Sequence, residues 1–114
     1  MTSETARLLI DRLLAKTRAG SLAWEGGADG HTFRTRVGGA ELFVTSFDFE
    51  HGDDSGLRYQ LDVTDGDGRV ADTFDREYPH GLDDGPLVDL YRAARGSARG
   101  ADRLLDSVLT ALGG

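Results

Sequence analysis

The sequence predicts an α+β fold: an antiparallel β-meander of about five strands with an N-terminal helix and two C-terminal helices packed on one face. Residues 57–64 alternate between apolar and polar side chains, and a turn at 65–68 leads into a second strand at 69–74. This is the pattern of a hairpin with one apolar face. Both ends of the chain carry apolar residues at spacings of three and four, as in amphipathic helices that cover such a face.

The composition indicates one globular domain. The chain has 114 residues, of which 39% are hydrophobic and 29% charged, so we expect a single α+β domain over residues 1–114. There is no cysteine, which excludes disulfides, thiolate nucleophiles and zinc sites built on sulfur, and fits a cytoplasmic protein. Charged residues recur through the first twenty positions, so we expect no signal peptide and no membrane association.

The excess of acidic over basic residues affects which partners the protein can bind. Twenty acidic residues against thirteen basic ones give a formal net charge of -7. A polyanion would meet net repulsion instead of the attraction that drives nucleic-acid binding. We therefore expect no DNA or RNA partner.

The first element is predicted as a helix that Ser3 caps and Gly20 ends. Glu4 lies in its first turn and two basic residues lie in its last turn, where each charge complements the helix dipole. Leu22 and Trp24 then alternate in a short strand, and a glycine-rich turn follows at 26–30.

Two strands are predicted next, at 32–37 and 41–50, joined by a tight turn at Gly38-Gly39. The second strand is ambiguous, because apolar residues occupy both of its faces. Either a bulge near residues 45 and 46 switches the register, or an aromatic set projects from the open side of the sheet. One face carries Leu42 and Val44, and the other carries Phe43, Phe47 and Phe49.

After the hairpin at 57–74, residues 75–85 show neither helical nor strand periodicity and are predicted as a loop. Gly85-Pro86 then begins a helix with proline in its first turn. We expect a break near Gly100 and a last helix that Asp102 caps and Gly113 ends. Its apolar residues are Leu104, Leu105, Val108, Leu109 and Leu112.

Several segments resemble one small bacterial protein family with no known activity. The similarity includes the run Lys-Thr-x-x-Gly-x-Leu-x-Trp-Glu at 16–25 and a Tyr-x-Leu-x-Val strand followed by an Asp-Gly turn. It continues with Leu90-Tyr91-Arg92-Ala93-Ala94-Arg95 and then Asp102 and Leu105. The resemblance spans nearly the whole chain. It implies a helix, a curved antiparallel meander and a C-terminal helical pair, and it implies no active site.

No catalytic, metal or cofactor site is predicted. Two of the three histidines, His51 and His80, lie near aspartates, but their spacing matches no zinc signature. The acidic residues at 62–68 lack the closing glutamate of a calcium loop and suit a hairpin turn. No Gly-x-Ser-x-Gly turn and no phosphate-binding loop are present.

The candidate contact residues are aromatic: Trp24, Phe43, Phe47 and Phe49. Large aromatic side chains on the open face of a one-sided sheet indicate a contact surface. For Trp24 we favour a place in the core. For the three phenylalanines the core and the open face are equally compatible with the pattern.

The sequence therefore favours a small non-catalytic binding or regulatory module that acts through protein contacts. A protein partner or homodimer would use the open face of the sheet or an edge strand. One alternative is a small-ligand binder or enzyme with a pocket near the 75–85 loop, using Tyr78, His80 and Asp83. Another is an acidic inhibitor or immunity-type protein for a basic partner.

Overall fold

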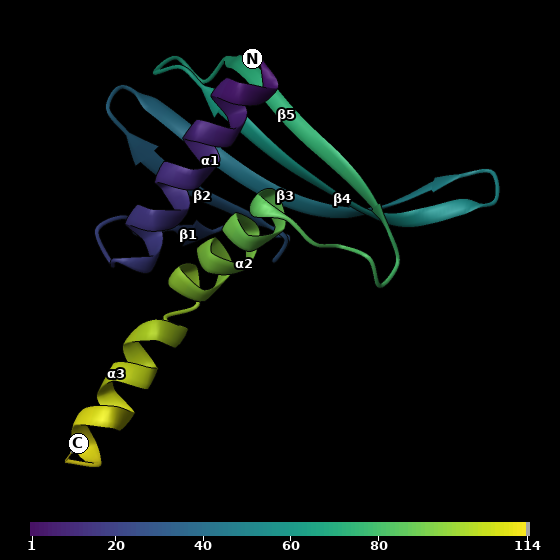
Figure 1. Ribbon diagram of the computed structural model, residues 1–114. Helices are drawn as coiled ribbons and strands as arrows, with labels where there is room; N and C mark the ends of the chain where they lie inside the picture. Colours follow the sequence, from purple (N-terminus) through teal and green to yellow (C-terminus); the bar gives the residue numbers. More distant parts are fainter. Residues whose placement is uncertain (114) are drawn as a thin grey trace.

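Five strands and three helices follow one another in the order that the sequence predicts. The computed structural model describes residues 1–113, apart from the side chains of residues 101–103. The elements are α1 (Ser3–Arg18), β1 (Glu25–Gly26), β2 (Thr32–Val37), β3 (Ala40–His51), β4 (Asp54–Thr64), β5 (Val70–Pro79), α2 (Pro86–Ala98) and α3 (Ala101–Ala111). The α+β class is confirmed, and Figure 1 shows α1 and α2 beside one curved sheet.

The sheet is an antiparallel meander with the strand order β1-β2-β3-β4-β5. β2 turns into β3 through Gly38-Gly39, as predicted, and Gly38 has the positive φ of 61° that such a turn requires. β3 pairs with β4 without interruption from Glu41 to His51. The alternative of a bulge near residues 45 and 46 is therefore wrong, and the one irregularity between described strands lies at Val63/Thr64.

Several predicted boundaries shift. Thr2, not Ser3, is the N-cap of α1, and its side chain accepts a hydrogen bond from the Thr5 N–H at 3.1 Å. The strand predicted at 22–24 begins later, at Glu25. β5 continues beyond residue 74 to Pro79, where pairing with β4 overrides a sequence without strand periodicity.

The core lies between one face of the sheet and the two helices α1 and α2. The inward side chains of β4, Tyr59 and Leu61, are the ones that the alternating pattern places on the apolar face. The largest fully buried side chains are Ile10 from α1, Val44 and Leu61 from the sheet, and Val88 and Leu90 from α2. Because the sheet contributes to this core from one face only, its other face remains open.

Gly56 marks a close approach of two strands. A Cβ atom at this position would lie 2.0 Å from the carbonyl oxygen of Tyr78 and 3.0 Å from a ring carbon of Phe49. Backbone atoms cannot yield at that distance without moving β5. Glycine at position 56 is therefore required for β5 to pair with the start of β4.

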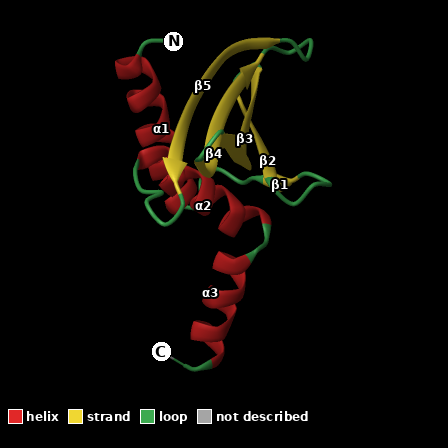
Figure 2. Cartoon of the chain, turned by 90° about the vertical axis from the view of Figure 1, so that its right-hand side faces the viewer, coloured by secondary structure: helices red, strands yellow, loops and turns green. Residues whose placement is uncertain are grey.

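The last helix differs from the expectation that both C-terminal helices pack on the sheet. α2 and α3 meet at Gly100, the N-cap of α3, with a φ of 68°; Asp102 therefore lies inside the helix, and its side chain is outside the described part. From this junction α3 projects away from the sheet (Figures 1 and 2). The Cα radius of gyration of 15.3 Å exceeds the value of about 13 Å that suits a compact domain of this length.

Candidate functional site

Trp24 is a core residue, as favoured from the sequence, with 3% of its surface exposed. Its indole Nε1–H donates to Thr17 Oγ1 at 2.9 Å, and that hydroxyl donates to the Leu13 carbonyl at 2.7 Å. Its backbone N–H donates to Ser97 Oγ at 3.1 Å. Trp24 thus joins the C-terminal end of α1 to that of α2. Its role is structural, and its ring is not available to a partner.

The three phenylalanines lie on the open face of the sheet. Leu42 and Val44 occupy the opposite face, where 3% and 0% of their surfaces are exposed. Phe47 is exposed at 39%, whereas Phe43 and Phe49 are half-buried. The sequence was compatible with the phenylalanines in the core or on the open face, and the structure places them on the open face. Because two of the three rings are half-buried there, little apolar surface remains exposed.

Polar groups cover most of the open face around these rings. The Arg58 guanidinium lies 5.6 Å from the centre of the Phe47 ring and pairs with Glu77. This pairing lowers the pKa of Glu77. Farther along the sheet, Thr73 Oγ1 donates to Asp62 at 2.7 Å. Most polar groups of the open face are thus paired with one another, although the buried Arg58 Nε makes no hydrogen bond. Such a face is a poor surface for apolar docking.

Ion pairs also occupy the β1 side of the open face. Arg34 Nη2 lies 2.7 Å from Glu25 Oε2, and Arg36 Nη2 lies 3.1 Å from Glu41 Oε1. The hydrogen bond from Arg34 lowers the pKa of Glu25, and the pKa of Arg34 rises for the same reason. These charges are already paired within the chain.

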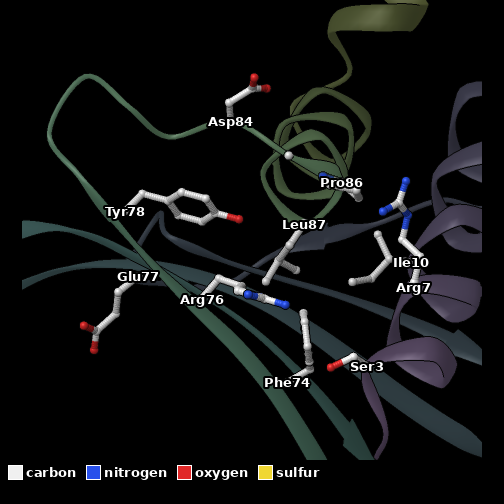
Figure 3. A pocket seen from close by; sticks show the side chains of 11 residues that line it. Ser3, Arg7, Ile10, Phe74, Arg76, Glu77, Tyr78, Asp84, Pro86 and Leu87 are labelled. Atoms are coloured by element: carbon white, nitrogen blue, oxygen red, sulfur yellow. The ribbon is translucent and has the colours of Figure 1, made fainter.

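Of Tyr78, His80 and Asp83, only Tyr78 lines the cavity near the 75–85 loop. This cavity of about 360 Å³ lies between β5 and the first turns of α1 and α2. Figure 3 shows the Tyr78 hydroxyl pointing into it, with Arg7 of α1 on the far side and Arg76 beside Tyr78 on the same strand. His80 is exposed on the loop and does not line the cavity.

Asp83 instead belongs to a small polar cluster at the N-terminal half of α2. The Tyr59 hydroxyl donates to Asp83 Oδ2 at 2.8 Å, and Arg92 Nη2 lies 3.2 Å from the same oxygen. The hydrogen bond from Tyr59 lowers the pKa of Asp83. Burial, followed by this hydrogen bond, raises the pKa of Tyr59 to about 12. Asp83 therefore anchors the loop to the core.

Five of the ten exposed large apolar residues of the described part lie on α3 and its C-cap, a helix that we expected to pack on the sheet. Each of its large apolar residues exposes between 46% and 76% of its surface; they are Leu104, Leu105, Val108, Leu109 and the C-cap residue Leu112. Figure 1 shows α3 extending beyond the rest of the chain, with no other element beside it except the end of α2.

The amphipathic pattern of α3 was visible in the sequence, but its environment was not. An apolar stripe looks the same whether it faces the chain's own core or another molecule. The signal that bears on its position is Gly100, because a left-handed residue there turns the chain out of the α2 axis.

Comparison with known proteins adds no relative: no family model, no curated protein and no solved structure matches the chain. Among the described residues, no helix is long and apolar enough to cross a membrane. The described residues also contain no group of three or more histidine, aspartate or glutamate side chains placed to hold a metal ion.

Proposed function

We propose that this protein is a small non-catalytic interaction module that docks onto another protein chain through α3. The observation that carries the proposal is the exposure of all five large apolar residues of this helix and its C-cap, between 46% and 76%. Monomeric proteins seldom leave so many adjacent apolar side chains in water, and such patches mark contact surfaces. Helices with this pattern bind in apolar grooves or against other helices.

The local stability of α3 supports the same proposal. The helix has eleven residues, no side-chain hydrogen bond at its N-cap and no basic residue in its last turn. Isolated helices shorter than about 12–15 residues are marginal in water, because the first turn is costly to form. A partner that covers the apolar stripe would supply the packing that this helix lacks within its own chain.

The sheet offers less to a partner than α3 does. β5 is an edge strand of ten residues, but it carries four charged side chains and ends in Pro79. Charges and proline on an edge oppose the addition of another strand. On the open face the exposed ring of Phe47 is already covered on one side by Arg58.

A pair of matched variants tests this function. Leu105→Asp places a charge in the α3 stripe, whereas Leu82→Asp places one on an equally exposed leucine of the loop before α2; their exposed fractions are 61% and 68%. We expect Leu105→Asp to abolish the native complex in a co-purification from cells and Leu82→Asp to preserve it. A complex that survives Leu105→Asp would contradict docking through α3.

A second candidate function is the binding of a small anionic molecule in the cavity beside Tyr78. The observation that favours it is a cavity of about 360 Å³ with Arg7 and Arg76 on its lining, a volume within the range of ligand sites. Glu77 and Asp84 also line the cavity, but Figure 3 shows their carboxylates directed away from its centre. Arg7 pairs with Asp11 at 3.3 Å, so Arg76 is the cation that an anionic ligand would contact first. Phosphate and benzoate titrations followed by NMR test it. Shifts confined to the cavity residues and lost in Arg76→Ala would support it, and unchanged spectra would contradict it.

A further inference from the structure

Four aspartates of the chain stand immediately before a glycine, in the pairs 29–30, 65–66, 67–68 and 84–85. In such a pair the glycine nitrogen can attack the carboxyl carbon of the aspartate side chain, because glycine has no Cβ to hinder the approach. The attack needs a carboxyl group that is free to turn toward the backbone, and an amide N–H that is not held by an acceptor. These two conditions separate the four pairs.

The Asp29-Gly30 pair is held at both reacting groups. Asp29 Oδ1 accepts hydrogen bonds from the N–H groups of His31 and Thr32, both at 2.9 Å, and Oδ2 accepts from the Thr32 hydroxyl at 2.8 Å. The Gly30 N–H donates to the Gly27 carbonyl at 3.3 Å. The hydrogen bond from His31 is the main cause of the lowered pKa of Asp29. The carboxyl group is thereby kept ionised, and an ionised carboxylate is a poor electrophile.

In the turn between β4 and β5, each of the two pairs is held at one reacting group. Asp65 Oδ1 accepts hydrogen bonds from the N–H groups of Asp67 and Arg69 at 2.9 and 3.0 Å, which fix its carboxylate. In the second pair, the Gly68 N–H donates to the Asp65 carbonyl at 3.1 Å. Reaction at either pair must first break such bonds, and those to the charged carboxylate are the stronger ones.

The Asp84-Gly85 pair differs from the other three, because both of its reacting groups are free. Within the described part of the chain, the Asp84 carboxylate has no hydrogen bond or ion pair, and the Gly85 N–H donates to no acceptor. Asp84 is exposed and lies in a segment that is neither helix, strand nor turn. Figure 3 shows its carboxylate with no other labelled side chain beside it. The preceding Asp83 is bound by the Tyr59 hydroxyl, so this freedom belongs to Asp84 itself.

We propose that Asp84-Gly85 is a site of spontaneous aspartate isomerisation. The Gly85 nitrogen forms a bond to Cγ of Asp84, and its proton leaves with the carboxyl hydroxyl as water, which closes a succinimide ring. A water molecule then adds to the main-chain carbonyl carbon of residue 84 and breaks the bond from that carbon to the Gly85 nitrogen. The chain now continues through Cβ and Cγ, with a free α-carboxylate. One water leaves and one enters, so the step needs no other reactant.

The modification would alter the entry to α2. The isoaspartyl linkage lengthens the main chain by one methylene group between the anchored Asp83 and Gly85, which is the N-cap of α2 with a φ of 137°. Gly85 lies against the cavity, because a Cβ at this position would be 3.3 Å from the Tyr78 hydroxyl. The inference does not depend on docking through α3, since it concerns a different part of the molecule.

Peptide mapping of the aged native protein tests the inference. The purified chain is incubated at mildly acidic pH in water labelled with heavy oxygen and digested with trypsin in ordinary water. The peptides 19–34, 59–69 and 77–92 contain the four pairs, and fragmentation by electron transfer assigns each isoaspartyl linkage to a residue. We expect label and isoaspartate at Asp84 about tenfold faster than at Asp29 and Asp65, whose carboxylates must first leave their hydrogen bonds. The advantage over Asp67 should be smaller.

Two controls show whether the fold sets this order. The same incubation in urea removes the hydrogen bonds and should bring the four rates together. Asp84→Glu keeps the charge but would have to close a larger ring, so it should abolish the label in 77–92 and leave the other two peptides unchanged. Native protein without isoaspartate at Asp84, a faster rate at another pair, or the same order of rates in urea would overturn the proposal.

Discussion

The hydrogen bond between Trp24 and Thr17 should contribute measurably to the stability of the fold. Replacing Thr17 with valine keeps the shape of the side chain and removes the acceptor of the indole N–H, which lies at 2.9 Å. Both residues are 3% exposed, so no water replaces the lost oxygen. An unsatisfied buried donor costs about 1–3 kcal/mol. At roughly 4–8 °C per kcal/mol for a domain of this size, Tm should fall by about 10 °C.

A double-mutant cycle isolates this bond from the packing of the indole ring. Trp24→Phe alone should destabilise the protein, because it leaves a cavity in the core. In the background of Trp24→Phe, however, Thr17→Val leaves no indole N–H without an acceptor, so it should change the free energy of unfolding little. The coupling energy should be about 1–2 kcal/mol, measured by urea denaturation with far-ultraviolet circular dichroism, since the only tryptophan is replaced.

If Thr17→Val changes the free energy of unfolding by less than about 0.5 kcal/mol, then the indole N–H either gains another acceptor or is not buried as the structure has it. A coupling energy near zero, with both single variants destabilised, would assign the whole effect to packing. Thr110→Val, a change at an exposed threonine of α3, is the matched control and should have little effect.

Three further predictions concern the loop and the strand that meet α2. Gly56→Ala should destabilise the protein by at least about 2 kcal/mol, because the new Cβ would lie 2.0 Å from the Tyr78 carbonyl oxygen; wild-type stability in urea would contradict this close approach. The pKa of Tyr59 is raised to about 12, so its neutral hydroxyl stabilises the fold fully below pH 10, and this stabilisation is lost as the pH rises through 12. Tyr59→Phe should therefore lose less stability at alkaline pH than the wild type. An identical dependence of stability on pH in the two proteins would contradict the raised pKa of Tyr59. The lowered pKa of Asp83 means that its ionised carboxylate stabilises the fold above pH 4, and this stabilisation is lost as the pH falls through the pKa of the folded state. Asp83→Asn should therefore reduce the loss of stability at acid pH, measured by urea denaturation at a series of pH values. The same loss of stability at acid pH in the variant and the wild type would contradict this prediction.

The candidate contact residues show how far a pattern of residues can specify a surface. Alternation placed Phe43, Phe47 and Phe49 on one face of a strand, and that face is the open one. The alternation along this strand does not show which side chains of the neighbouring strands lie next to the three rings. Arg58 is brought over the Phe47 ring by the pairing of β3 with β4, and it removes much of the apolar surface that the sequence indicated.

The loop residues illustrate the same limit. Tyr78, His80 and Asp83 lie within six positions of one another, which suggested a shared pocket. In the structure Tyr78 is the last but one residue of β5 and faces the cavity, His80 is in solvent, and Asp83 binds the buried Tyr59 hydroxyl. Nearness in sequence does not specify direction once a strand ends, because each residue of the loop takes its own backbone conformation.

The α+β class, the order of the elements and the inward face of the hairpin can all be predicted from the residue pattern alone. Periods of 2 and 3.6 residues are local properties, and so are the positive-φ turns at glycine. The residue pattern does not show which apolar stripe the chain itself covers. The stripe of α2 lies against the sheet and that of α3 lies in solvent, although both follow the same helical periodicity. Burial depends on where the chain turns at Gly100 and on how much sheet surface α1 and α2 already occupy, and neither quantity is encoded in the pattern of a single segment.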